Sequence, residues 1–270
     1  MQLILLSFDI EEFDVPLEQG IDYPFDKQMA VSIEGTLVVL ESLRKHQIRA
    51  TFFCTANFAL HAPEVIRMIV QDGHEIASHG YYHSSFNNDD LKSSRECLEK
   101  LSGQNVEGFR MARMMEVNTE CTKSAGYLYN SSLNPTFIPG RYNNLNKPRT
   151  YYYDEGVLQI PSSVTPFFRF PLFWLSFHNL PLQFYQWMLC QCVDHDGYAA
   201  IYFHPWEFVD LKSYTKDFKL PRIMMRNTGE AMQNRMDALL TSLKNKKYQF
   251  VSYSDFRKLI QSDSKNDNNR

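Results

Sequence analysis

Short apolar runs with β-strand character alternate along this chain with segments of helical periodicity. The first run, Leu3 to Phe8, ends in an acidic cluster, and apolar residues then recur at Ile33, Leu37, Leu40 and Leu43 in a helical pattern. Consecutive parallel strands need a crossover connection, which is usually a helix. The alternation therefore predicts an α/β fold with a mostly parallel sheet, either open or closed into a barrel.

About seven strand candidates occur along the chain, a number that favours a barrel. No repeat or linker rich in Pro, Gly or Ser marks a domain boundary, so residues 1–261 are predicted to form a single domain. Residues 134–155 are predicted to form a loop, and the polar residues 262–270 a disordered tail. After the first strand we predict strands at Ala50–Cys54, His74–Ser78 and Val106–Arg110 and others ending at Tyr129 and Phe203, with helices at Pro63–Val70 and Asp89–Leu101.

Composition and charge exclude several classes of function. The 270 residues include 28 Lys and Arg against 31 Asp and Glu, a net charge of −3, which indicates no nucleic-acid-binding surface. The apolar run near the start of the sequence, Leu3 to Leu6, is far shorter than the roughly 20 residues of a membrane span. No basic residue precedes it, as one would in a signal peptide. The five cysteines lack the second pair of a zinc ribbon and are interpreted as reduced, buried thiols. We therefore expect a cytoplasmic protein with no transmembrane segment.

Polar residues with catalytic chemistry stand where predicted strands give way to loops. Asp9 and Glu11 follow the first strand, His79 and His83 follow the third, and His204 follows a late strand. The carboxyl ends of parallel strands form the ligand-binding face of α/β sheets and barrels. We therefore expect these side chains to converge on one site.

The spacing His79-x-x-x-His83 brings two imidazoles to one side of a helical turn or a tight loop, as a divalent metal requires. Gly80 follows His79, so the metalloprotease pattern with its internal glutamate is absent, and a third ligand and a base must come from elsewhere. On an extended segment Asp9 and Glu11 point to the same face, so the acidic cluster can supply both.

Two further acidic residues, Glu12 and Asp14, belong to this cluster. Glu12 would face away from Asp9 and Glu11, and we interpret Glu12 and Asp14 as residues of a solvated loop. The sequence nevertheless leaves open whether Glu11 or Glu12 is the carboxylate ligand.

Short motifs around these residues follow one another in a defined order. They are Ser7–Asp9, Ala50–Phe53, Gly73–His83, Gly108–Arg110, Tyr129–Ser132, Leu158–Pro161 and Phe203–Glu207. In order and content they resemble the motifs of the polysaccharide deacetylases, carbohydrate esterases similar to family four that share the NodB homology domain. The resemblance spans about residues 3–255 and is greatest to a branch similar to peptidoglycan deacetylases without signal peptides, in which one residue separates the two carboxylates.

The resemblance implies a distorted (β/α)7-type barrel and metal-dependent removal of acetyl groups from N-acetylated sugars of a poly- or oligosaccharide. Residue by residue, it implies that Asp9 is the catalytic base, that Glu11, His79 and His83 are metal ligands, that Arg110 orients the base and that His204 is the general acid. Four protein ligands would leave a tetrahedral site no place for the nucleophilic water, which also favours the acid role for His204. Zn²⁺ is the expected cofactor, and the mixed nitrogen and oxygen ligands also suit Co²⁺ or Ni²⁺.

Aromatic residues near these motifs are candidates for substrate contact. Trp206 follows the His204–Pro205 pair, Tyr82 lies inside the His79–His83 motif, and both are predicted to bind substrate. The segment 166–174 contains five aromatic residues in nine positions. It is interpreted either as core or as the subunit interface of a homo-oligomer, or else as a platform for sugar rings or a lipid-linked precursor.

Two other functions stay open at this point. One is the hydrolysis of a small non-polymeric amide on the same fold, as in proteins that resemble allantoinases. Alternatively, Glu11 in place of an aspartate, Met111 in place of a proline and Asn130 in place of an aspartate would fit a degenerate, non-catalytic carbohydrate-binding protein.

Overall fold

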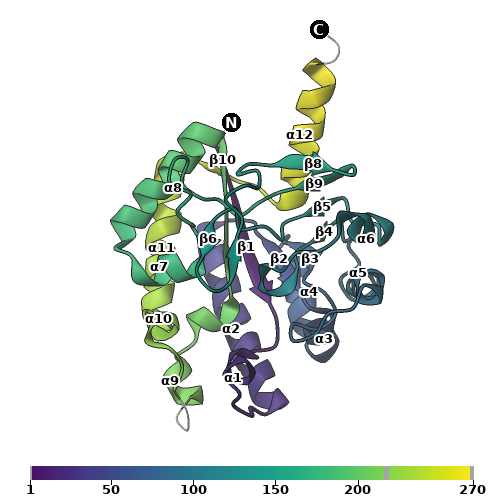
Figure 1. Ribbon diagram of the computed structural model, residues 1–270. Helices are drawn as coiled ribbons and strands as arrows, with labels where there is room; N and C mark the ends of the chain where they lie inside the picture. The colour runs from purple at the N-terminus through teal and green to yellow at the C-terminus, as the bar shows by residue number, and fades with distance from the viewer. Residues whose placement is uncertain (1, 216–218, 268–270) are drawn as a thin grey trace.

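A curved sheet of parallel strands forms the centre of the computed structural model, which describes residues 2–215 and 219–267 (Figure 1). Seven parallel strands follow one another in the order β10-β1-β2-β3-β4-β5-β9. Their bounds are β1 Leu3–Ile10, β2 Thr51–Cys54, β3 Glu75–Ser78, β4 Gly108–Phe109, β5 Tyr129–Asn130, β9 Val157–Gln159 and β10 Tyr198–Phe203. The predicted α/β fold is confirmed.

The parallel strand order ends at β10 on one side and at β9 on the other, and no ladder of strand pairs among the described residues joins these two strands. β8 (Tyr152–Asp154) pairs antiparallel with β9 at one edge, and β11 (Gln249–Phe250) pairs with the start of β1. Across the gap to β10, the backbone N–H of Ser163 donates to the Ala200 carbonyl at 2.8 Å, and the Ala200 N–H donates to the Ser163 hydroxyl at 2.8 Å. These few bonds replace a full ladder and make the predicted barrel a distorted one.

Residues alternate between the inside and the outside of the barrel along its strands. In β1, Leu3 and Leu5 pack inside with Tyr253 and Phe256 of the C-terminal helix, whereas Ile4 and its alternate neighbours pack against the outer helices. All eight residues of β1 are buried, because helices and strands cover both of its faces. This period of two carries Asp9 and Glu11 to the inner face at the carboxyl end of the strand.

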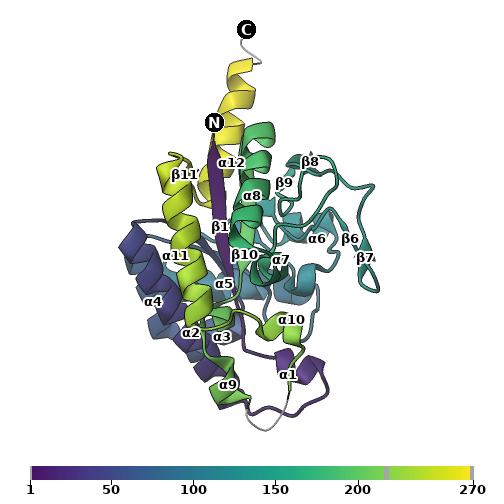
Figure 2. The same ribbon diagram turned by 90° about the vertical axis from the view of Figure 1, so that its left-hand side faces the viewer.

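Helices surround the outside of the sheet (Figures 1 and 2). The longer ones are α2 Phe25–His46, α4 Pro63–Gln71, α5 Asp89–Ser102, α8 Leu182–Asp196, α11 Glu230–Asn245 and α12 Tyr253–Asp267. The short ones are α1 Val15–Glu18, α3 Ala56–His61, η1 Ala112–Met114, α6 Thr119–Ser124, α7 Trp174–Asn179, η2 Pro205–Phe208, α9 Leu211–Tyr214 and α10 Arg222–Met225. Among the described residues, no helix combines the length and the apolar character needed to cross a membrane.

Two segments differ from their predicted structure. The predicted loop 134–155 contains a hairpin of β6 (Phe137–Ile138) and β7 (Tyr142–Asn143), followed by β8. The predicted tail begins inside α12, which continues to Asp267, and residues 268–270 lie outside the described residues. Polar composition at residues 262–267 is compatible with the end of a helix as well as with a coil, and α12 projects from the body at this end (Figure 1).

Candidate active site

A cavity of about 350 Å³ opens where β1, β3 and β10 end. This edge of the sheet was expected to be the ligand-binding face, and the polar residues predicted from the strand ends meet there. The lining includes Asp9, Glu11, His79, His83, His204 and Trp206.

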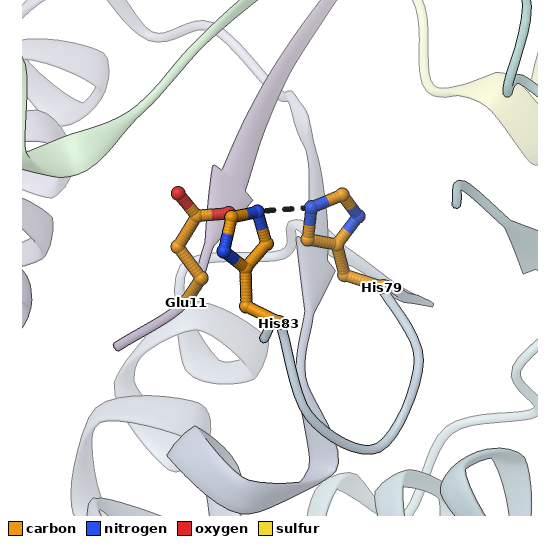
Figure 3. Close-up of side chains that lie close together, drawn as sticks. All are labelled: Glu11, His79 and His83. Carbon is orange, nitrogen blue, oxygen red and sulfur yellow. Dashed lines mark ion pairs between the residues drawn. The ribbon is translucent and has the colours of Figure 1, made fainter. Parts of the chain in front are cut away.

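Glu11, His79 and His83, which we call the candidate ligand group, point toward one another in this cavity (Figure 3). The Oε2 atom of Glu11 lies 3.3 Å from Nε2 of His79 and 3.0 Å from Nε2 of His83. Glu11 follows directly on β1, His79 follows directly on β3, and a tight loop then returns His83 to the same side. All three side chains are buried.

Hydrogen bonds on the far side of each imidazole ring orient this group. Nδ1 of His79 donates to the backbone carbonyl of Arg110 at 2.9 Å, and Nδ1 of His83 donates to the Asp14 carboxylate at 2.8 Å. Both Nε2 atoms are thereby left with a lone pair that faces Glu11. The buried Oε2 of Glu11 has no hydrogen-bond partner among the described residues. Two imidazole nitrogens and an unpartnered carboxylate oxygen around one point fit a divalent cation.

The charges of the candidate ligand group depend on one another. Burial by itself would raise the pKa of Glu11, but His83, His79 and His204 hold it well below its usual value. Burial would likewise lower the pKa of His83, but the carboxylates of Glu11 and Asp14 raise it well above its usual value. Glu11 is therefore ionised, and a proton competes with a cation for His83.

Asp9 and Arg110 form a fully buried ion pair beside this group. Nη1 of Arg110 donates to Oδ1 of Asp9 at 2.5 Å and to the Ser7 hydroxyl at 3.0 Å. Its Nη2 donates to the hydroxyls of Ser131 and Tyr253. Burial would lower the pKa of Arg110, but Asp9 raises it, so the guanidinium stays charged and fixes the position of the carboxylate.

His204 stands on the other side of the cavity, supported by two residues to which the sequence analysis assigned no role. Its Nδ1 lies 2.9 Å from Oε1 of Glu207, and the other oxygen of Glu207 lies 2.7 Å from Nε2 of His178. Burial would lower the pKa of His204, but Glu207, Glu11 and Asp9 together raise it. The sequence could have indicated Glu207, because it belongs to the Phe203–Glu207 motif. His178 lies in none of the motifs and could not have been identified in this way.

The interpretation of Glu12 and Asp14 as solvated loop residues is wrong, because both are buried. The Glu12 carboxylate accepts hydrogen bonds from the side chains of Thr55 and Asn57, and it therefore faces away from the cavity. Asp14 holds the outer nitrogen of His83. The loop after β1 folds inward, and the structure places Glu11, not Glu12, beside the two histidines.

The two predicted substrate-binding residues lie in different environments. Trp206 lines the cavity, where its ring stacks on that of His204 with centroids 5.3 Å apart. Tyr82 is 43% exposed, packs on Tyr81 and is not part of the cavity lining. The loop turns His83 inward, and the adjacent tyrosine consequently points outward, so the structure does not bring Tyr82 to the site.

The departures from the expected motifs at Met111 and Asn130 are accommodated locally. Asn130 donates to Oε1 of Gln159 at 2.8 Å and accepts a hydrogen bond from Ser132. The Ser132 hydroxyl in turn accepts a bond from the Met111 N–H at 2.8 Å. A neutral amide thus bridges β5 and β9 at this position.

Comparisons with known proteins relate part of this chain to polysaccharide deacetylases. Residues 24–128 match the family model described as polysaccharide deacetylase, a range that includes His79, His83 and Arg110. Peptidoglycan-N-acetylmuramic acid deacetylase PdaA of Bacillus subtilis is 29% identical over 131 residues, which are 45% of this chain and 49% of PdaA. The match therefore spans about half the length of that relative.

Solved structures share the fold over nearly the whole chain. A protein from Mycobacterium smegmatis, solved as a candidate polysaccharide deacetylase, superposes with a TM-score of 0.65 and 19% identity, covering 97% of this chain and 91% of that one. The Puue allantoinase superposes with a TM-score of 0.64 and 16% identity, covering 94% of this chain and 88% of that one. Taken together, the family model matched by residues 24–128 and the curated relative support a polysaccharide deacetylase, and the solved structures show that the chain shares their fold.

Proposed function

We propose that this protein is a hydrolase that removes acetyl groups from the N-acetylated sugars of a poly- or oligosaccharide. The observation that carries the proposal is the convergence of the candidate ligand group, the Asp9–Arg110 ion pair and His204 around one cavity. Hydrolysis of an acetamide needs an activated water, a base that takes its proton and an acid that protonates the departing amine. The cavity walls offer a group for each task.

The candidate ligand group is proposed to hold one divalent ion, with Zn²⁺ as the first choice. Three protein ligands leave coordination positions free, which is the pattern of catalytic rather than structural zinc. When bound, the ion would lower the pKa of a coordinated water and polarise the acetyl carbonyl. Co²⁺ and Ni²⁺ suit the same nitrogen and oxygen donors, and the donor types alone do not choose among the three.

Asp9 is the proposed base and His204 the proposed acid. The bond from Arg110 occupies Oδ1 of Asp9, which leaves Oδ2 to accept a proton from the attacking water. Glu207 holds Nδ1 of His204 and leaves Nε2 to carry a proton to the sugar nitrogen. The raised pKa of His204 keeps that proton in place before the reaction.

The shape of the site supports an extended substrate over a small amide. The cavity of about 350 Å³ adjoins a second cleft of about 760 Å³. The two share five lining residues, which are Glu18, Arg113, Met114, Arg141 and Tyr142. A chain of several sugars can therefore continue from the candidate ligand group along the surface.

Acetate release from a panel of N-acetylated oligosaccharides tests the proposal, using protein stripped by a chelator and then reloaded with Zn²⁺ or Co²⁺. We expect release only with metal, and elemental analysis to find one ion per chain. Release from small cyclic amides alone would favour the allantoinase-like alternative. Binding of N-acetylated oligosaccharides without release, by metal-free protein, would favour a non-catalytic carbohydrate-binding protein.

A cytoplasmic location is a further proposal. The cysteines support it, because all five are free thiols in the structure. Fractionation of the source cells with immunodetection tests it, and recovery of the protein with the extracellular fraction would contradict it.

A further inference from the structure

Two phenylalanine side chains project into solvent from the turn between Thr165 and Phe170. Phe167 is 83% exposed and Phe168 is 93% exposed, the two highest values among the exposed large apolar side chains of the described residues. Contiguous exposed apolar groups on a folded protein usually mark an interaction site.

The turn that carries them is firmly held. The Thr165 N–H donates to the Phe170 carbonyl at 2.9 Å, and the Arg169 N–H donates to the Thr165 carbonyl at 3.1 Å. The Arg169 guanidinium donates to the Lys147 carbonyl at 2.8 Å, and the Thr136 hydroxyl donates to the Arg169 carbonyl at 2.7 Å. The fold therefore keeps both phenyl rings in solvent, because its own hydrogen bonds fix the backbone on either side of them.

An apolar groove of about 550 Å³ extends from this turn toward the catalytic cavity. Its lining residues come in part from β6, α7 and α10, elements that can be located in Figure 2. Phe137 and Ile223 in this groove are each 51% exposed. Phe173, Leu175 and Ile223 line both the groove and the catalytic cavity, so the two are continuous.

Basic side chains that have no acidic partner among the described residues lie at the α10 end of the groove. Residues 133–153, 156–193 and 219–229 contain seven basic residues, of which Lys147 pairs with Glu116 and Arg149 pairs with Asp196. Arg222 and Arg226 lie on either side of Ile223, and neither has an ion-pair partner in the described part of the chain. The face formed by the turn at Thr165–Phe170, the groove and α10 thus combines exposed aromatic side chains with two arginines that no carboxylate of the described residues neutralises.

We propose that this face docks on an anionic lipid bilayer, with Phe167 and Phe168 entering the interfacial layer. Aromatic side chains favour the boundary between lipid headgroups and acyl chains, and flanking basic residues are attracted to anionic headgroups. A second copy would bring the same unpaired Arg222 and Arg226 against each other, so charge complementarity favours an anionic bilayer over self-association. Docking would hold the catalytic cavity next to the membrane surface. The inference rests on this face alone and holds whatever the substrate is.

Co-sedimentation of the full chain with phosphatidylcholine vesicles, with and without phosphatidylglycerol, tests the proposal. We expect binding to the anionic vesicles that weakens as salt is raised. The double variant Phe167→Ser/Phe168→Ser should bind about tenfold less. The double variant Arg222→Glu/Arg226→Glu should lose at least about fivefold per reversed charge.

The control variants change exposed residues of α3 and α5, which do not line the groove. Leu60→Ser in α3, where Leu60 is 45% exposed, and Lys100→Glu in α5 should bind as the unchanged protein does. Circular dichroism should show every variant folded, because the changed side chains are exposed. Acetate release from soluble oligosaccharides should be equal in the unchanged protein and the phenylalanine variant, which separates this test from that of the proposed function.

Two results would overturn the proposal. One is that the unchanged protein binds neither kind of vesicle, or that the phenylalanine variant binds as well as the unchanged protein. The other is self-association in sedimentation velocity that requires Phe167 and Phe168 and occurs without vesicle binding, which would make this face a subunit interface.

Discussion

At the scale of single residues, the candidate site is a set of buried charges in which almost every polar atom has a partner. Each histidine of the candidate ligand group uses its Nδ1 on a carbonyl or carboxylate, and the Asp9 carboxylate is held by Arg110. The unpartnered Oε2 of Glu11 stands at the point where the two Nε2 atoms meet. Isolated buried charge is costly, so this arrangement is expected to be stable with a cation at that point.

His204→Ala should keep one metal ion per chain while turnover falls by roughly a hundredfold or more, because the variant lacks the proton donor but no proposed ligand. Elemental analysis and acetate release measure the two effects separately. The matched variant His83→Ala should lose metal and activity together. Loss of metal from His204→Ala would make His204 a ligand.

Asp14→Asn should weaken metal affinity by about 10- to 100-fold, because a neutral amide polarises His83 less than a carboxylate does. Isothermal titration of stripped protein with Zn²⁺ measures this affinity. Glu12→Gln is the control, since Glu12 bonds to Thr55 and Asn57 instead and its substitution should leave metal affinity unchanged. Equal affinities in all three proteins would show that Asp14 does not support the site.

At the scale of elements, the position of His204 depends on how closely α2 packs against η2. Gly35 of α2 faces this contact, and a Cβ built on it would lie 2.0 Å from the Pro205 carbonyl oxygen. Pro205 begins η2 and directly follows His204. Because Gly35 has no side chain, α2 can lie close to η2. This contact fixes the position of the turn that carries His204, the proposed acid.

Gly35→Ala should lower the free energy of unfolding by about 1–3 kcal/mol. In most helices, replacing glycine with alanine raises this free energy instead. The added methyl group meets backbone rather than a flexible side chain, so α2 and η2 must separate. Urea denaturation measures the change. Leu37→Ala on the exposed side of α2 should cost little, and a stabilised Gly35→Ala variant would contradict this account.

Glu207→Gln should move the alkaline fall of kcat/KM to lower pH. The proposed acid works while protonated, so activity is present below the pKa of His204 and is lost as the pH rises through it. Glu207 raises that pKa, and glutamine can keep the hydrogen bond but not the charge. A pH profile of acetate release measures the shift, and an unchanged profile would remove His204 from the acid role.

At the scale of the whole molecule, the buried guanidinium of Arg110 connects several strands of the barrel. Arg110 extends from the end of β4 to Ser7 and Asp9 of β1, to Ser131 after β5 and to Tyr253 of α12. Its guanidinium also lies 3.9 Å from the centre of the Phe53 ring on β2. The same contacts that orient the proposed base therefore hold the strands around the interior of the barrel.

Arg110→Met should lower the free energy of unfolding by about 3–5 kcal/mol, because it leaves the Asp9 carboxylate buried without its partner. Thermal and urea unfolding measure the loss. The double variant Asp9→Asn/Arg110→Met removes both charges and should recover part of it. If the double variant is as unstable as the single one, packing rather than charge explains the effect.

Local patterns in the chain were enough to predict the barrel and the main candidate residues. Alternation of apolar strands with helical periodicity predicts parallel strands, and the period of two along β1 places Asp9 and Glu11 on one face. The spacing between His79 and His83 predicts a shared direction for their rings, which Figure 3 shows. These features depend on neighbours within a few residues, so the sequence alone determines them.

Only the tertiary structure decided which polar residues surround these candidates. Asp14 meets His83 across 69 positions of the chain, and His178 meets Glu207 across 29. No local pattern reports such contacts, and for the same reason the sequence wrongly predicts that Asp14 and Glu12 are solvated and does not predict that Tyr82 lies outside the cavity lining. Whether a polar side chain is buried with a partner or exposed to water depends on segments that meet only after folding, and that long-range pairing is what turned a set of motifs into a site.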